Sequence, residues 1–254
     1  MLLTDGNPND KLALMVYESA ILSVANIESI NLDVKLRLAT EEISEDVLDI
    51  LLDHTSSTDP LSNVRRTIGV SDVVVTPQMK RWHALHTLAI VYRDAFNNQL
   101  NDRYLAKLTE YRELSKNARS HTIQFGIGLA LNPVPEAQQP VLSTISGSAP
   151  AGTFYVETSW VSATGAEGAP SVVTALTTAP EQDLVVQPVN PPAVATAFNV
   201  YIGATEDTLA RQNSSPLATG NSFTLTGALV TGIAPGTGQA PDIYITGGPT
   251  LRRG

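Results

Sequence analysis

The sequence contains no cysteine among its 254 residues. This absence excludes disulfide cross-links, cysteine-ligated zinc, iron–sulfur clusters and thiol catalysis, and it leaves the redox compartment open. No run of eighteen apolar residues occurs, so the sequence predicts no membrane-spanning helix. The first nine residues carry no basic stretch followed by an apolar one, and we expect no secretory signal. These absences favour a protein that belongs to a soluble assembly.

Charge is also sparse, and most of it is negative. Only 16% of the residues are charged, with 16 basic against 25 acidic side chains and a net charge of −9. Such a balance argues against a protein that grips nucleic acid by neutralising its phosphates. The length fits one large domain or two modest ones, each able to bury a core.

The motifs of common enzymes are missing. The sequence has no Gly-x-Ser-x-Gly elbow and no phosphate-binding loop, and Gly126-x-Gly128 lacks the third glycine of a dinucleotide site. His83 and His86 have a spacing that allows metal chelation, but no zinc-protease glutamate accompanies them, so a structural or interface role is favoured. The acidic cluster at 41–46 lacks the glycine of a calcium loop and is interpreted as a solvated helix start. We therefore predict no enzyme, no cofactor and no metal site.

Glycine and proline divide the chain into two halves. Residues 1–125 contain two glycines and three prolines, whereas residues 126–254 contain fifteen glycines and thirteen prolines. This contrast predicts an α+β protein with a helical first half and a β-rich second half. We expect a helical domain over 1–132 that ends in a strand, a proline-rich linker over 133–140, a β-sandwich over 141–246 and an arm over 247–254.

Capping residues and apolar spacing predict the helices of the first half. Asn9 or Asp10 is a candidate N-cap for the first helix, and Ser44 is one for a later helix. Residues 32–38 alternate in the manner of a short strand and stay ambiguous. Thr76 and the proline after it mark the clearest helix start, and residues 77–119 form one long kinked helix or two consecutive ones.

A short stretch after these helices alternates perfectly between apolar and small or polar residues. Ile123, Phe125, Ile127 and Leu129 are its apolar positions, which predicts a strand. It has no obvious hairpin partner nearby in the sequence. We therefore expect it to pair with a neighbour within the fold or in another subunit.

Short strands separated by turn residues fill the second half. We predict them at 141–146, 152–163, 171–177, 183–188, 197–203, 209–212, 222–226 and 242–246. Their number and spacing are typical of an antiparallel sandwich of the immunoglobulin or fibronectin type. Tyr155, Trp160 and Tyr201 form a possible sugar-binding platform, although core packing is the favoured interpretation of such aromatics.

Charge is distributed unevenly within the first half. Residues 5–59 carry three basic and twelve acidic side chains, whereas residues 80–119 carry eight basic and four acidic ones. One explanation is that acidic and basic helices of the same chain pack together as solvated faces. The other is self-association, in which the acidic face of one copy meets the basic face of the next copy in a ring.

Three stretches of the second half resemble the immunoglobulin-like domains of tailed-bacteriophage virion proteins. They are Pro150 to Val161, Gly165 to Ser171, and the strand Phe198-Asn199-Val200-Tyr201-Ile202-Gly203. The resemblance covers about ninety residues and implies an immunoglobulin-like sandwich. Modules of this kind occur on phage capsids, tails and necks.

The first half is similar to the head-to-tail connector, or adaptor, proteins of tailed phages. The similarity lies in an acidic helix pair, a long loop and the helices around 76–82, 89–94 and 104–111. It implies a structural virion protein of the neck that forms a twelve-fold ring. Its partners would be other copies of itself, the portal, tail or nozzle proteins, and double-stranded DNA that passes through the channel without sequence-specific binding. The alternative is a receptor- or carbohydrate-binding virion appendage.

Two segments are candidates for partner binding. Ile123, Phe125 and Ile127 lie on the predicted strand, whose unpaired edge could bind another chain. Leu251, Arg252 and Arg253 lie on the final arm, where an apolar anchor and two guanidinium groups could bind an acidic neighbour. A frayed terminus is the alternative for the arm.

Overall fold

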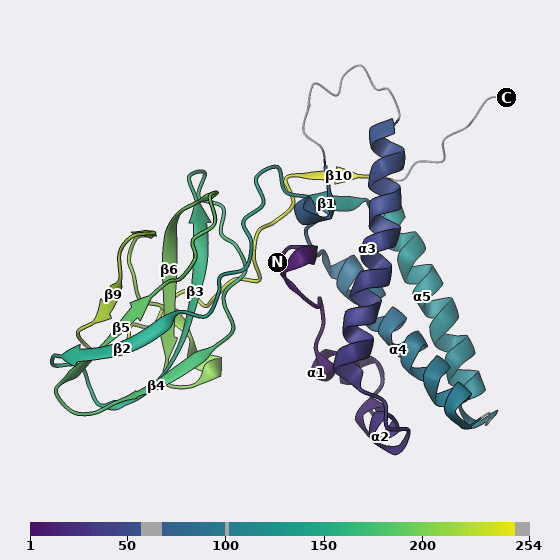
Figure 1. Ribbon diagram of the computed structural model, residues 1–254, viewed down its shortest axis with the longest axis horizontal. Coiled ribbons are helices and arrows are strands. Elements are labelled where there is room, and N and C mark those ends of the chain that lie inside the picture. Colours follow the sequence, from purple (N-terminus) through teal and green to yellow (C-terminus); the bar gives the residue numbers. More distant parts are fainter. Residues whose placement is uncertain (57–67, 100–101, 247–254) are drawn as a thin grey trace. The chain divides into compact units, whose positions relative to one another are not determined.

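The chain forms two compact units. The computed structural model describes residues 1–56, 68–99 and 102–246. The helical unit contains residues 6–131 and the chain from Pro241 onward, and the β unit contains residues 1–5 and 132–240 (Figure 1). Helices occupy the first half and antiparallel sheets follow, so the predicted α+β class is confirmed.

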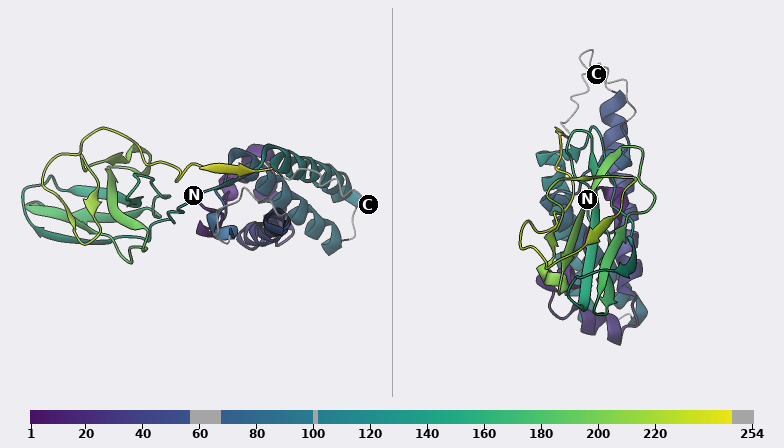
Figure 2. Two further views of the ribbon diagram at one scale, coloured as in Figure 1. Left: turned by 90° about the horizontal axis from the view of Figure 1, so that it is seen from above. Right: turned by 90° about the vertical axis from the view of Figure 1, so that its left-hand side faces the viewer.

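Five α-helices build the helical unit. They are α1 (Lys11–Tyr17), α2 (Ile21–Ile27), α3 (Leu32–Ser56), α4 (Pro77–Gln99) and α5 (Leu105–Phe125). The three long helices α3, α4 and α5 lie side by side in Figures 1 and 2, and α4 contacts both of the others. The region 77–119 therefore holds two consecutive helices, the second of the two forms that the sequence left open.

Local hydrogen bonds explain where two of the helices begin. Asp10 caps α1 through its Oδ1, which accepts from the Ala13 amide at 2.7 Å. Thr76 caps α4 in the same way, because its Oγ1 accepts from the Met79 amide at 3.3 Å. Both caps agree with the sequence-based expectation.

The start of α3 differs from the prediction. Asn31 caps this helix by accepting from the amides of Asp33 and Val34, whereas Ser44 lies inside it and donates to the Thr40 carbonyl at 2.7 Å. Residues 32–38 are helical because a helix places their apolar side chains on one buried face. The buried side chains of this face are Leu32, Leu36, Ala39 and Ile43, which follow one another at helical spacing. Val34 completes the strand-like alternation in the sequence, but its side chain is exposed.

The predicted strand over residues 123–129 is wrong in its first half. Helix α5 continues to Phe125, and only Ile127–Leu129 form a strand, β1. Gly126 ends the helix at φ +103°, and its amide donates to the Thr122 carbonyl at 3.0 Å. A Cβ at this glycine would lie 3.1 Å from the Ile245 carbonyl oxygen, so glycine suits both the conformation and the close approach.

β1 has partners within the chain on both of its edges. On one edge it pairs antiparallel with β10 (Ile243–Ile245), with Ile127 opposite Ile245. On the other edge the Val74 amide donates to the Gly128 carbonyl at 2.9 Å. Because β10 follows the β unit in the sequence, the β unit is an insertion between two paired strands of the helical unit. The predicted sandwich boundary at residue 246 therefore differs from the observed one.

The β unit consists of two antiparallel sheets. One has the order β2-β5-β9 and the other has the order β4-β3-β6-β7, with β8 paired to β6. The strands are β2 (Val141–Ser146), β3 (Gly152–Ser162), β4 (Thr174–Thr178), β5 (Gln182–Gln187), β6 (Ala195–Gly203), β7 (Ala210–Arg211), β8 (Leu217–Ala218) and β9 (Phe223–Leu225). Each strand predicted between residues 141 and 226 corresponds to one of these, and β8 was not predicted. The arrangement is compatible with a sandwich.

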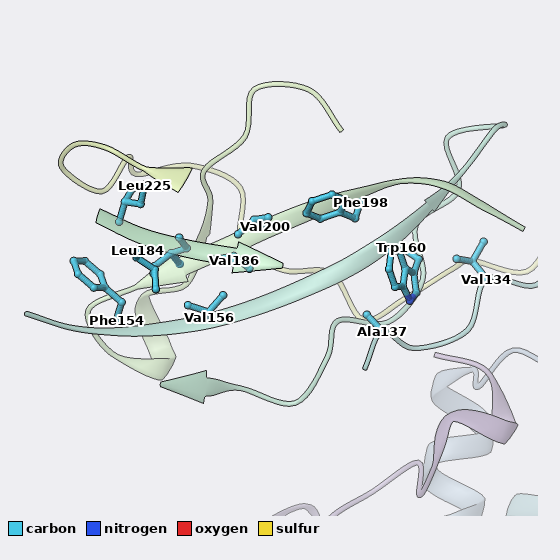
Figure 3. Packing of buried hydrophobic residues seen from close by; sticks show 11 residues of the cluster. Val134, Ala137, Phe154, Val156, Trp160, Leu184, Val186, Phe198, Val200 and Leu225 are labelled. Atoms are coloured by element: carbon cyan, nitrogen blue, oxygen red, sulfur yellow. The ribbon is translucent and has the colours of Figure 1, made fainter. Parts of the chain in front are cut away.

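One apolar core lies between the two sheets. Leu184 and Val186 of β5 point toward Phe154 and Val156 of β3 (Figure 3). At the other end of the core, the Trp160 ring meets the edge of Phe198, with ring centroids 6.4 Å apart at 71°. The core therefore draws on both sheets.

The segment predicted as a linker belongs to this core. Val134 is fully buried and Ala137 is nearly so, and both pack with Trp160 (Figure 3). The first residues of the chain also join the β unit, because Leu2 and Leu3 are buried and Asp5 accepts from the Glu136 amide at 3.0 Å. The predicted domains therefore differ from the observed units in residues 1–5, 132–140 and 241–246.

Candidate assembly surfaces

The structure separates the residues that were predicted to bind a partner. Ile127 is fully buried between its strand neighbours and cannot present its side chain to another molecule. Ile123 is half-buried on α5, whereas Phe125 is 63% exposed and keeps only a ring contact with His121. Leu251, Arg252 and Arg253 lie outside the described residues. Phe125 is therefore the one candidate among the described residues with an accessible side chain.

His83 is part of the interior of the helical unit. Its Nδ1 accepts from Asn9 Nδ2 at 3.0 Å, and its Nε2 lies 3.0 Å from both the Leu36 carbonyl oxygen and Thr40 Oγ1. Burial lowers the pKa of His83 to about 4, so the ring is neutral at pH 7. Since each ring nitrogen already has a partner, His83 joins α3 and α4.

His86 has different partners from His83. Its Nε2 lies 2.6 Å from Glu42 Oε2, and its Nδ1 lies 3.2 Å from Ser115 Oγ. Within the described residues, no three histidine, aspartate or glutamate side chains gather as metal ligands. The contacts of both histidines favour the structural role that the sequence suggested.

The aromatic residues of the β unit do not form an exposed platform. Trp160 and Tyr201 are both 2% exposed. The Tyr201 hydroxyl donates to Glu167 Oε1 at 2.5 Å. Burial raises the pKa of Tyr201, and this hydrogen bond raises the pKa further. Two of the three proposed platform residues are therefore inaccessible to a sugar.

Large apolar side chains lie on the surface of the helical unit. Six of them are more than half exposed among the described residues: Leu12, Val16, Ile27, Leu52, Phe125 and Tyr244. Five come from the helices α1, α2, α3 and α5, and Tyr244 comes from β10. Apolar side chains that are exposed singly are ordinary, whereas several that lie together can mark a surface that another protein covers.

A basic groove lies between α4 and α5. It encloses about 260 Å³, its floor includes Trp82 and Ile90, and its walls carry four basic side chains, Arg93, Arg112, Lys116 and Arg119. One carboxylate enters it, because Asp46 accepts from Arg119 at 2.9 and 3.2 Å. The volume is below the roughly 300–1,000 Å³ of small-molecule sites, so the groove suits a protruding side chain better than a cofactor.

Glu157 is a half-buried acid on β3 in the β unit. Its Oε2 is buried and has no hydrogen-bond partner among the described residues. Burial, together with the negative charges of Glu136 and Glu206, raises its pKa to about 7. The carboxyl group of Glu157 therefore binds its proton more tightly in the folded chain than in an unfolded chain, where its pKa is 4.5.

Replacing Glu157 by Gln is expected to remove a pH dependence from the β unit. The stabilisation from the protonated acid is complete below pH 4.5 and is lost as the pH rises through about 7. Glu157→Gln should match the wild type at pH 4 and be more stable at pH 8, by on the order of 1–2 kcal/mol after allowing for the partly open position. Urea unfolding at both pH values measures the difference, with Asp207→Asn as the exposed-acid control. An equal difference at both pH values would contradict the assignment.

No protein-family model matches the sequence, and no curated protein matches it. Within the described residues, none of the helices is long and apolar enough to cross a membrane.

Proposed function

We propose that this chain is a structural virion protein whose helical unit forms a closed ring that connects the portal of a tailed phage to its tail. The exposed apolar side chains on four helices of that unit are the observation that carries the proposal. Water would contact these surfaces in a solitary copy, whereas neighbouring subunits would cover them in a ring. The resemblance of residues 76–111 to connector helices gives the proposal its particular place in the virion.

We further infer that the β unit has an immunoglobulin-like topology. The pairing of β2 with β5 corresponds to strands B and E of that fold, and the order β4-β3-β6-β7 corresponds to C′-C-F-G. Trp160 on β3 then takes the position of the buried tryptophan on strand C. Two departures accompany this match, because no strand A occurs in the described part of the unit and β9 adds to β5.

The net charge of −9 is consistent with a channel for DNA. A ring of acidic subunits would repel the phosphates of DNA and would let the duplex slide through. Sequence-specific recognition is not part of the proposal.

A binding appendage is the second candidate function. It is favoured by an open hollow of about 740 Å³ in the β unit, whose lining mixes polar side chains such as Asp5, Glu136 and Gln138 with apolar ones such as Pro135 and Val172. A volume of this size can hold a small ligand such as a sugar. In this function the helical unit would serve as the anchor.

The mass of the purified chain in solution distinguishes the two candidates. A ring protein is expected to form an assembly of many copies, alone or when portal protein is added. A trimer whose binding depends on a glycan would support the appendage instead.

A further inference from the structure

We propose that the basic groove between α4 and α5 of one copy binds the outward-facing side of α3 of a second copy. This inference rests on the proposed ring, because it assigns the surfaces by which neighbouring copies would join. The groove supplies positive charge and an apolar floor, and α3 supplies the opposite charge together with protruding leucines.

The cations of the groove form a stripe along α5. Arg112, Lys116 and Arg119 follow one another at positions i, i+4 and i+7, so they share one face of the helix. Arg119 is already bound to Asp46 of the same chain. Arg112 and Lys116 are exposed and have no ion pair among the described residues. These two side chains are available to a partner.

The outward face of α3 carries a matching stripe. Glu41, Glu45, Leu48 and Leu52 follow one another at i, i+4, i+7 and i+11, and all four are exposed. The opposite face of α3 is the buried one, and it packs Ile43, Val47 and Leu51 into the helical unit. Two carboxylates and two leucines therefore project from one side of the helix, away from their own core. Glu41 also has a long, exposed ion pair with Arg37, one turn earlier on the same helix, at 3.8 Å.

The spacing of the two stripes agrees. Glu41 and Glu45 are one helical turn apart, as are Arg112 and Lys116, so both pairs are separated by about 6 Å along the helix axis. Two acid–base pairs can therefore form at the same time. Leu48 continues the acidic stripe, so it would enter the hollow above Trp82 and Ile90 while the charges pair beside it.

Such a contact is heterologous, since the groove and the stripe are different surfaces of one chain. Each copy then binds one neighbour through its groove and the other neighbour through its α3 stripe. Repeating the same rotation from copy to copy gives a ring when the rotation closes on the first copy. The contact also accounts for the uneven charge of the sequence, in which residues 5–59 are acidic and residues 80–119 are basic.

Nucleic acid fits the groove less well than a second copy does. A phosphate that reached Arg112 or Lys116 would also approach the carboxylate of Asp46, which repels it. The apolar floor has no charge or hydrogen-bond donor that would bind a phosphate. A stripe of mixed acidic and apolar side chains uses both parts of the groove.

Two complementary charge-reversal variants test the contact. The first carries Arg112→Glu and Lys116→Glu, and the second carries Glu41→Lys and Glu45→Lys. Each variant alone places like charges in every contact, so we expect at least a tenfold higher concentration for assembly than for the wild type. In a mixture, the acidic groove of the first variant meets the basic stripe of the second, and the basic groove of the second meets the acidic stripe of the first. Assembly should therefore return, with the two variants alternating around the ring. Glu206→Lys with Asp207→Lys, on the β unit, is the control and should assemble as the wild type does.

Sedimentation velocity in low-salt buffer measures the size of the assembly in each sample, because salt would screen the charge pairs. Recovery in the mixture supports the contact and also shows that both variants are folded. Assembly of each variant at the wild-type concentration overturns the contact and leaves the ring proposal standing. Failure of the mixture to assemble, with helical circular dichroism retained in both variants, overturns the contact in the same way. DNA retention that depends on Arg112 and Lys116, with assembly unchanged, assigns the groove to nucleic acid instead. A wild-type chain that stays monomeric at every concentration, both alone and with portal protein, overturns both proposals.

Discussion

A chain that ends after Ala240 is expected to lose much of the stability of its helical unit. The truncation removes β10, whose Ile245 is buried at 5% exposure and whose strand covers β1. Burial of an isoleucine contributes about 1.5–3 kcal/mol, and each lost hydrogen bond costs about 1 kcal/mol more. The lost bonds include Asp242 amide to Leu129 carbonyl at 2.8 Å and Leu131 amide to Asp242 Oδ2 at 2.7 Å. The free energy of unfolding of a folded domain is only about 5–15 kcal/mol, so the truncation should remove a large part of it.

The fluorescence of Trp82 measures this effect, because Trp82 is buried in the helical unit and the other tryptophan lies in the β unit. A chain that ends after residue 246 keeps β10 and is the matched control. A second control replaces residues 132–240 with a short turn, which keeps β10 beside β1 and should also preserve the helical unit. If the chain that ends at Ala240 unfolds at the same urea concentration as the control that ends at 246, β10 does not belong to this unit.

Replacing Trp160 by Ala should destabilise the β unit by about 3–5 kcal/mol. Trp160 is 2% exposed, packs edge-on against Phe198, and contacts the segment that contains Val134 and Ala137. Truncation leaves a cavity that a core drawn from both sheets can fill only in part. The loss is a large fraction of the about 5–15 kcal/mol that stabilises a folded domain, so the variant should unfold at low urea concentration.

Trp160→Phe is the conservative control and should cost less, because it keeps a ring beside Phe198. Far-ultraviolet circular dichroism follows both units, whereas the fluorescence of Trp82, the one tryptophan left in both variants, follows the helical unit alone. The expected result is early loss of the β unit with the helical transition unchanged. A simultaneous shift of both transitions would mean that the two units unfold as one.

The parts of the fold that depend on neighbouring residues were predictable from the sequence. Asp10 and Thr76 cap their helices because the required oxygen lies three residues before the amide that it binds. The strands of the β unit follow from alternation and from turn residues, which act over a few positions. These signals need no information about distant residues.

Long-range pairing could not be predicted in the same way. β1 and β10 are separated in the sequence by the entire β unit, and nothing in either three-residue strand specifies the other. The burial of Val134 was also missed, because prolines on both sides favour an extended chain whether it is free or packed. The alternation at 123–129 misled because its first half lies in α5, which continues to Phe125 and ends only at Gly126, where φ is +103°.

The basic groove was partly visible in the sequence. The charge balance of residues 80–119 indicated a basic surface. The prediction did not extend to individual side chains, although Arg112, Lys116 and Arg119 have the spacing of one helix face. The sequence could not show that α4 supplies an apolar floor to the same groove, because that depends on how α4 and α5 pack.

Averaged particle images of the purified chain, with and without portal protein, test the proposed ring most directly. The account predicts closed rings of twelve copies with a central opening, and rings stacked on the portal when it is added. Open fibres, trimers or single copies that ignore the portal would contradict it.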